Sequence, residues 1–276
     1  MTAAPQTPID GSGTDRARCV LAHNPGLMTL DGTNTWLVAE PGSPTAVVID
    51  PGPDDQAHLR RVLEVAERAG QRVATIVLTH GHDDHSGGAR ALAGLTGAGV
   101  RAVDPAHRLG AEGLPPGAVV TDGGCEIEVL ATPGHTADSV SLYLRADRAV
   151  MTGDTVLGRG TAVIAYDGSL ADYLGSLDRL RALADAADLR TLLPGHGPIL
   201  ARPLDVLDFY ITHRAERLAE IRAALAAGDR TKAQIVASVY ADVDRALWPF
   251  AEISVRAQLT YLADRGELPT DMPLPS

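Results

Sequence analysis

Short apolar runs bounded by turn-forming residues recur through the first 200 residues of this 276-residue chain. The runs are rich in Val, Ile and Leu and span three to seven residues, which is typical of β-strands. Helical patterns lie between some of them, so the order of elements indicates an α/β (α+β) fold. The predicted strands cover residues 18–21, 35–38, 45–50, 73–79, 100–103, 119–121, 126–131, 139–144, 149–152 and 191–193.

Amphipathic stretches in the same region predict three helices. The first begins at Asp54 or Asp55, because either residue is a good N-cap, and it runs to about Ala69 before Gly70 ends it. The other two helices are predicted near residues 88–95 and 172–183. All three have apolar residues at helical spacing on one side, so we expect them to cover the sheets.

The pattern changes after residue 200, where only helices are predicted. They cover residues 203–227, 231–240 and 251–263, and Thr231 with Gln234 forms the capping box of the second. We expect Trp248, Pro249 and Phe250 to lie between helices as an apolar wedge. Three helices and a short final turn suggest a reduced winged-helix domain, so we divide the chain into an α/β domain, residues 1–200, and a winged-helix-like helical domain, residues 201–276.

Charge and cysteine content narrow the class of protein. The formal net charge is -11 and Lys232 is the only lysine, so a basic stripe for non-specific phosphate binding is not expected. Cys19 and Cys125 form no CxxC motif and are too few for a disulfide framework. Residues 1–14 are polar, unlike a signal peptide, and no run of 18 apolar residues occurs. These features predict a cytoplasmic protein without a membrane segment.

The largest group of potential metal ligands in the sequence directly follows the predicted strand 73–79. The stretch His80-Gly-His82-Asp-Asp84-His85 places three imidazoles and two carboxylates in six positions. Ligand sites of open α/β sheets tend to lie at the carboxyl ends of strands. Three further strands end on ligand-capable residues within Pro-Gly or Gly turns, which project a side chain from the strand end. These residues are His135, Asp154 and His196.

Together the seven side chains predict a centre for two metal ions. We assign His80, His82 and His135 to one ion. We assign Asp84, His85 and His196 to the other ion, and Asp154 to both as a bridge. Imidazole and carboxylate ligands suit zinc, and a hydroxide can occupy the remaining shared position, because metal-bound water has a pKa near ~7. We therefore expect two Zn²⁺ ions, although nitrogen and oxygen donors do not exclude iron or manganese. Asp84 is also the candidate catalytic residue that orients the hydroxide.

His80-x-His82-x-Asp84-His85, followed by His135, Asp154 and His196, resembles the metallo-β-lactamase superfamily. The resemblance implies an αβ/βα sandwich of two mixed sheets with helices outside, and it implies the same ligand assignments. Zinc β-lactamases carry Cys at the position of Asp154, so β-lactam hydrolysis is not favoured. Flavodiiron oxidoreductases usually carry Glu at the position of His82, so a redox iron site is not favoured either. Only 41 residues separate Asp154 from His196, which excludes the large inserted domain of the nucleic-acid-processing branch.

A narrower resemblance is carried by Asn24-Pro25-Gly26, by Gly32-Thr33-Asn34-Thr35-Trp36 and by Thr132-Pro133-Gly134-His135-Thr136. These stretches resemble the lactamase-β-like protein 2 family. The likeness implies either an endoribonuclease acting on single-stranded RNA or a thioesterase acting on acyl carriers. It continues beyond His196 and implies the winged-helix-like domain as well.

The expected function is therefore a metal-dependent hydrolase in which a metal-bridging hydroxide attacks an ester, thioester or phosphodiester. The missing basic stripe favours a small-molecule or acyl-linked substrate, whereas the family resemblance favours single-stranded RNA. A non-catalytic, metal-stabilised nucleic-acid-binding regulator is the alternative from a different class. The loops 28–34 and 158–167 are expected to border the cleft, with Thr33 and Asn34 as substrate contacts. Nothing in the sequence identifies a partner protein.

Overall fold

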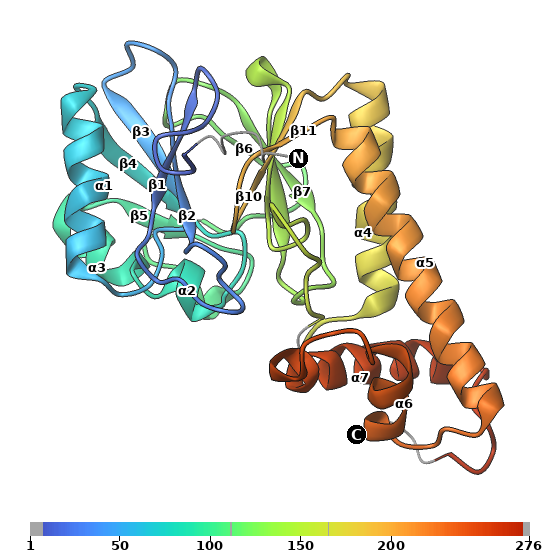
Figure 1. Ribbon diagram of the computed structural model, residues 1–276. Coiled ribbons are helices and arrows are strands. Elements are labelled where there is room, and N and C mark those ends of the chain that lie inside the picture. Colours follow the sequence, from blue (N-terminus) through green and yellow to red (C-terminus); the bar gives the residue numbers. More distant parts are fainter. Residues whose placement is uncertain (1–7, 111, 165, 273–276) are drawn as a thin grey trace, which may run out of the picture.

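The computed structural model describes residues 8–110, 112–164 and 166–272. Two mixed β-sheets face each other at the centre, and helices cover both outer faces (Figure 1). This arrangement is the predicted αβ/βα sandwich of two mixed sheets. A group of C-terminal helices extends from one side of it.

The first sheet has the order β1-β2-β3-β4-β5, with β3, β4 and β5 parallel and the other pairs antiparallel. The second has the order β11-β10-β9-β8-β7-β6, in which β9 and β10 are parallel and the other pairs antiparallel. The strands of the first sheet are β1 (Ala17–Leu21), β2 (Asn34–Val38), β3 (Thr45–Ile49), β4 (Arg72–Val77) and β5 (Gly99–Arg101). Those of the second are β6 (Val119–Val120), β7 (Ile127–Ala131), β8 (Val140–Leu144), β9 (Ala149–Gly153), β10 (Thr191–Pro194) and β11 (Leu200–Ala201).

Helices α1 and α3 lie on the outer face of the first sheet, and α4 and α5 lie on the outer face of the second (Figure 1). Asp55 caps α1 as predicted, and Thr231 with Gln234 forms the predicted capping box of α6. The α-helices are α1 (Gln56–Arg68), α2 (Asp83–Ser86), α3 (Ala89–Thr96), α4 (Leu170–Ala186), α5 (Pro203–Ala227), α6 (Lys232–Val239) and α7 (Trp248–Asp264). The 3-10 helices are η1 (Pro105–His107), η2 (Arg145–Asp147) and η3 (Arg245–Leu247).

Alternation of side chains along the strands builds the layers. In β3, Val47 and Ile49 belong to the apolar cluster between the two sheets, whereas Ala46 and Val48 belong to the cluster under α1 and α3. Successive side chains of a strand point to opposite faces, so one apolar run fills two cores at once. A third apolar cluster joins the second sheet, α4, α5, α6 and α7.

The structure differs from the prediction most clearly at three places. A four-residue helix, α2, replaces the expected loop at Asp83–Ser86. Helix α4 begins at Leu170, because Ser169 is its N-cap, and not near Asp172. Trp248 starts α7 with Pro249 in the first turn, so these residues do not lie between helices as expected. Proline suits this place since the first turn needs no donor from it.

No helix in the described ranges combines the length and the apolar character that a membrane span requires. The division of the chain after residue 200 stays a prediction. Helix α5 packs along α4 in the sandwich and also against α6 and α7 (Figure 1), so the two predicted domains share apolar contacts.

Candidate metal centre

The structure brings together all seven predicted ligand residues. Three groups have ligand atoms within 4.8 Å of one another, so that each could hold a metal ion. One group is His80, His82 and His135, and another is Asp84, His85 and His196. The third is His80, His85 and Asp154, which connects the first two. The two sets inferred from the sequence are therefore neighbours that meet at Asp154.

Helix α2 turns the chain within the first histidine loop, so that residues of this loop reach both ligand groups. His82 is the N-cap residue in an extended conformation, and its carbonyl accepts hydrogen bonds from the backbone N–H groups of His85 and Ser86. The chain therefore turns immediately after His82. Asp84 and His85 then face the second ligand group while His80 and His82 face the first.

Two glycines give the ligand loops the space that they need. Gly134, just before His135, has φ +137°, and a Cβ there would lie 2.3 Å from the Tyr173 Cα atom of α4. A Cβ at Gly195 would lie 2.6 Å from Asp154 Oδ1 and 2.7 Å from His85 Cε1. Only glycine avoids these clashes, so the Pro-Gly-His turns predicted from the sequence are needed for close packing at the site.

Hydrogen bonds on the outer side of the cluster fix the tautomers of three imidazoles. The Nδ1 atoms of His135 and His196 donate to the Val163 carbonyl at 2.6 Å and the Gly32 carbonyl at 3.1 Å. His85 Nδ1 donates to the Asp50 carboxylate at 2.9 Å. Carbonyl and carboxylate oxygens only accept, so the proton of each ring lies on Nδ1. In the neutral form of each ring, Nε2 then presents a lone pair to the centre, as a metal ligand must.

Asp50 is a functional residue that sequence reasoning missed. It lies directly after β3, is buried and has φ +50°. Its carboxylate accepts bonds from the Thr79 backbone at 2.7 Å, the Thr79 hydroxyl at 2.6 Å and His85. Because that hydroxyl donates to Asp50, its oxygen accepts from His80 Nδ1 at 3.1 Å. Asp50 thus orients two ligands. A carboxylate ending an apolar strand was the signal that could have found it.

The inward atoms fit a cation. His82 Nδ1 lies 3.0 Å from His80 Nε2 and 3.1 Å from His135 Nε2. The Nε2 atoms of His85 and His196 are 3.1 Å apart. Lone pairs at such distances repel unless a proton or metal ion lies between them. Asp154 Oδ1 is buried and has no hydrogen-bond partner among the described residues, so the donor set fits a metal site.

Asp154 lies between the two ligand groups. Its carboxylate oxygens are 3.4 Å from His85 Nε2, 3.4 Å from His196 Nε2 and 3.7 Å from His135 Nε2. Burial alone would raise the pKa of Asp154, but His196 and His85 hold it well below its ordinary value. The carboxylate is therefore ionised, and its negative charge is available to neighbouring cations.

The imidazoles of His80 and His196 differ in their affinity for a proton. Burial and the nearby His85 lower the pKa of His80 well below its ordinary value. Burial acts in the same direction on His196, but Asp154 and Asp84 outweigh it and raise that pKa to about 9. Asp84 Oδ2 lies 3.1 Å from His196 Nε2. Asp84 also has the most exposed carboxylate of the cluster, at 28% against 11% for Asp154.

Thr33 and Asn34 are placed differently from the expectation. Both are fully buried, so the structure does not support a contact with substrate. The Asn34 side-chain amide donates to the carbonyls of Pro194 at 2.9 Å and Gly197 at 2.8 Å, on both sides of His196. Thr33 forms a β-bridge with His196. These residues anchor the His196 loop.

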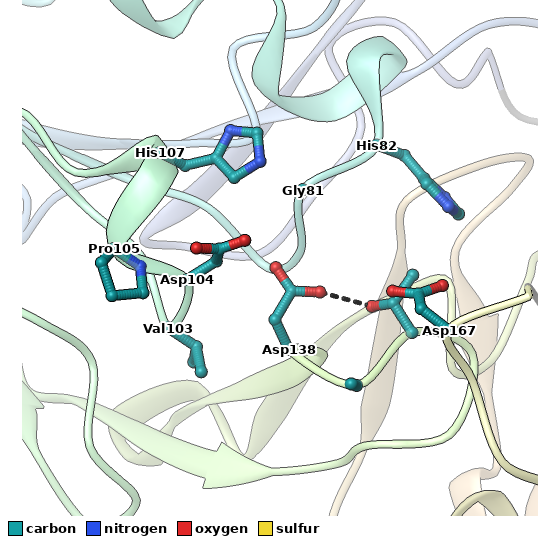
Figure 2. Close-up of a pocket in the computed structure, with 10 residues that line it drawn as sticks. Gly81, His82, Val103, Asp104, Pro105, His107, Asp138 and Asp167 are labelled. Carbon is teal, nitrogen blue, oxygen red and sulfur yellow. Dashed lines mark hydrogen bonds between the residues drawn. The ribbon is translucent and has the colours of Figure 1, made fainter.

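Two cavities flank the cluster. One, of ≈ 490 Å³, adjoins His82 and carries the carboxylates of Asp104, Asp138 and Asp167 on its wall (Figure 2). The other, of ≈ 430 Å³, reaches His135 and Asp154 from the side of α5 and α7. Residues of the predicted loops 28–34 and 158–167 line this second cavity, as the sequence indicated.

Residues 28–196 match the family model of the metallo-beta-lactamase superfamily. The chain belongs to this superfamily. Residues 231–268 match the model of the beta-lactamase associated winged helix domain, which confirms the winged-helix character predicted for the C-terminal helices. For a metallo-β-lactamase-fold protein, clusters of His and Asp at this place are consistent with a metal-dependent hydrolase.

Relatives of this metallo-β-lactamase superfamily protein support the narrower resemblance. A beta-lactamase-like protein 2 homolog from Caenorhabditis elegans is 32% identical over 265 residues, covering 92% of this chain and 86% of its own. One from Drosophila melanogaster is 32% identical over 270 residues, covering 90% and 88%. The solved structure of a beta-lactamase domain protein from Burkholderia ambifaria has a TM-score of 0.77 at 23% identity, covering 96% of this chain and 91% of that chain. That structure supports the fold alone.

Proposed function

We propose that this protein is a binuclear zinc-dependent hydrolase that cleaves an ester, thioester or phosphodiester. The supporting observation is the junction of two three-residue donor groups at one ionised carboxylate, that of Asp154. Structural zinc sites have four protein ligands and no open position. Six donor residues around the one shared carboxylate of Asp154 are better suited to two ions with a position left for a reactant.

When bound, two zinc ions would supply a nucleophile by lowering the pKa of water to about ~7. The chain's own groups prepare the place where that water would be held. Tautomers fixed by Asp50, Val163 and Gly32 keep lone pairs directed inward. Asp84 has the most accessible carboxylate of the cluster, so we assign to it the orientation of the attacking water.

The cavity next to His135 and Asp154 supports a small or acyl-linked substrate. Its volume of ≈ 430 Å³ lies in the range of about 300 to 1,000 Å³ that is usual for small-molecule sites. Leu27, Met28 and Leu30 contribute apolar wall. Apolar groups in that position favour a substrate with an apolar part close to the scissile bond.

Single-stranded RNA is the second candidate substrate. Tyr240 and Phe250 line the same cavity, and aromatic faces can stack on bases. The formal charge of -11 counts against tight binding of a long polyanion.

We also propose a cytoplasmic location for this protein. Cys19 and Cys125 are free and buried, which supports it.

Replacing Asp154 with alanine tests the function. We expect loss of metal from the second group and loss of turnover, because one carboxylate serves both groups. The measurement is zinc, iron and manganese content on protein purified without added metal, together with turnover of acyl thioesters, lactoylglutathione and single-stranded RNA. Asp178→Ala on the exposed side of α4 is the matched control. A variant Asp154→Ala that keeps two metals and full activity would refute the assignment.

A further inference from the structure

The ≈ 430 Å³ cavity at the metal centre has walls from distant parts of the chain. The segment 27–30 and the segment 157–163 form one side, and residues of α5 and α7 form the other. His135 and Asp154 lie in the same wall, so a molecule in this cavity touches the metal ligands. We call it the helical-domain pocket.

Basic side chains are concentrated in the helical-domain pocket. Arg159, Arg214 and Arg217 all line it, and Asp154 is the only carboxylate among its described lining residues. This local excess contrasts with the chain as a whole, whose formal charge is -11. Asp154 belongs to the metal cluster, and the acidic partners of Arg159 and Arg217, Asp31 and Glu220, are not among the described residues that line the pocket.

Arg214 is the most informative of the three. It is 4% exposed, and its guanidinium lies 4.8 Å from the centre of the Tyr173 ring. One guanidinium nitrogen donates to the Ala162 carbonyl, whereas Nε is buried without a hydrogen-bond partner. Within the described residues no carboxylate forms an ion pair with it, while Arg159 pairs with Asp31 and Arg217 with Glu220.

A buried guanidinium without a counter-ion is costly, because its charge has lost water and gained no opposite charge. An anionic group in the pocket would supply that charge. Guanidinium groups bind carboxylate, sulfonate and phosphate oxygens through charge-assisted hydrogen bonds. The ionic group of such a ligand would lie beside the apolar wall formed by Leu27, Met28 and Phe250.

The cavity on the other side of the cluster has the opposite character. Asp104, Asp138 and Asp167 line it next to His82 and His107, and no Arg or Lys is among its described lining residues (Figure 2). An anionic group is repelled from that wall and attracted to the helical-domain pocket. The two cavities therefore favour opposite charges on a bound molecule.

We infer that the helical-domain pocket recognises an apolar substrate with an anionic group, and that Arg214 and Arg217 determine this specificity. The inference rests on the proposed function, because it places this part of the substrate beside the scissile bond. It assigns α5 and α7 to substrate recognition as well as to packing.

Binding of three probes with the same alkyl chain tests the inference. Octane-1-sulfonate, octan-1-ol and octylammonium are titrated into the zinc-loaded protein by calorimetry, and sulfonate is chosen because it is a weak zinc ligand. We expect octane-1-sulfonate to bind about tenfold more tightly than octan-1-ol, as one charge-assisted hydrogen bond implies, and octylammonium to bind least.

The arginine variants decide which residues carry the preference. Arg214→Gln and Arg217→Gln should each reduce sulfonate affinity about tenfold with little change for octan-1-ol. Arg222→Gln is the matched control, since Arg222 lies on the same helix but is not among the described residues that line the pocket. Thermal unfolding shows whether Arg214→Gln is folded. Arg217 has 20% of its side chain exposed, so Arg217→Gln decides the question if Arg214→Gln does not fold.

Equal binding of sulfonate and alcohol, or sulfonate binding that survives in folded Arg214→Gln and Arg217→Gln, would overturn the inference. So would a single-stranded oligonucleotide that displaces the sulfonate and binds more tightly with the same arginine dependence, since the occupant would then be nucleic acid. Arginine-dependent sulfonate binding in a protein that hydrolyses no ester, thioester or phosphodiester would support the pocket and refute the proposed function alone.

Discussion

At the scale of single residues, the metal cluster depends on side chains that do not belong to it. Asp50 contacts the ligand residue His85 directly. Through the Thr79 hydroxyl it also orients the ring of His80. One buried carboxylate therefore orients a ligand in each of the two groups. Partners of this kind keep ligand nitrogens directed at the metal and raise their basicity.

Replacing Asp50 with asparagine should weaken metal binding. The amide has the same size, but its NH2 group cannot accept from both Thr79 and His85, so the two rings lose their common anchor. We expect a loss of about 10- to 100-fold in zinc affinity, measured by competition with a chromophoric chelator. Asp122→Asn, at an exposed position, is the control. Unchanged affinity in Asp50→Asn would show that the ligand rings are held by packing alone.

His58 makes stability depend on pH at a place away from the cluster. Burial lowers its pKa to about 4, and Arg61 acts in the same direction. The unfolded chain, with an ordinary pKa of about 6.5 at this residue, therefore binds a proton that the folded chain does not. The contribution to stability is complete above pH 6.5 and is lost as pH falls from there towards 4, by up to ~3 kcal/mol.

Denaturant unfolding of the protein and of His58→Gln at pH 7 and pH 5 measures this effect. We expect the native protein to lose more free energy of unfolding over that interval than the variant. The comparison removes the contribution of other groups that titrate in the same range. An equal loss in both proteins would contradict the role of His58.

At the scale of elements, the site depends on how closely the loop after β7 approaches α4. Gly134 has φ +137° and lies against the Tyr173 backbone. The Tyr173 hydroxyl donates to the Thr155 carbonyl at 2.6 Å, so α4 contacts the loops of both His135 and Asp154. A disturbance at this contact changes the position of two ligands together.

Gly134→Ala should therefore destabilise the protein by several kcal/mol and weaken metal binding, because the new methyl group has no free space and the backbone has a conformation that alanine disfavours. Gly175→Ala in the middle of α4 is the matched control. Its nearest neighbour would be an Arg179 guanidinium nitrogen at 3.4 Å, so we expect a gain of up to ~1 kcal/mol. Chemical denaturation and zinc titration of both variants give the answer.

The sequence predicted elements with long repeating patterns better than it predicted short ones. The helix 203–227 shows a clear period and the strand 45–50 is an apolar run followed by a turn, and both occur close to the expected bounds. Helix α2 has only four residues, which is too short for a helical period. Trp248 and Pro249 suggested an interruption, whereas proline is favourable in the first turn of the helix that they begin.

The clustering of the candidate ligands was predictable because His and Asp next to strand ends have few structural explanations. Thr33 and Asn34 were not, because the same polar residues suit a binding loop and a loop that anchors another segment. Both residues contact the segment 194–197, which lies more than 150 positions away in the sequence. Asn34 and Pro194, for example, are 160 positions apart. Local patterns hold no information on such a contact.

At the scale of the whole molecule, the sandwich and the C-terminal helices share one apolar core. A single apolar cluster includes Leu192 of the second sheet, Leu177 of α4 and Val255 of α7. The Tyr210 hydroxyl of α5 is bonded to Leu157 and Gly160 next to the site. The helical domain is thus attached both to the core and to the loops of the metal centre.

We expect the metal-loaded protein to unfold in one transition despite its two family-model matches. Differential scanning calorimetry with far-ultraviolet circular dichroism measures this, because coincident transitions by both methods indicate a two-state process. Zinc is present in excess in both experiments, so that loss of metal does not create a separate step. Two resolved transitions would show that residues after 200 fold independently.

Helix α5 passes from the sandwich to the helical domain without interruption (Figure 1). Its 25 residues contain no glycine, and proline only at the start, so it is a continuous helix about 37 Å long. Helix α5 therefore has no hinge within its own length, and the first glycine after it is Gly228, its C-cap residue. In the proposed function, substrate would reach the helical-domain pocket past the segment 27–30, where Leu27 and Met28 are 63% and 42% exposed.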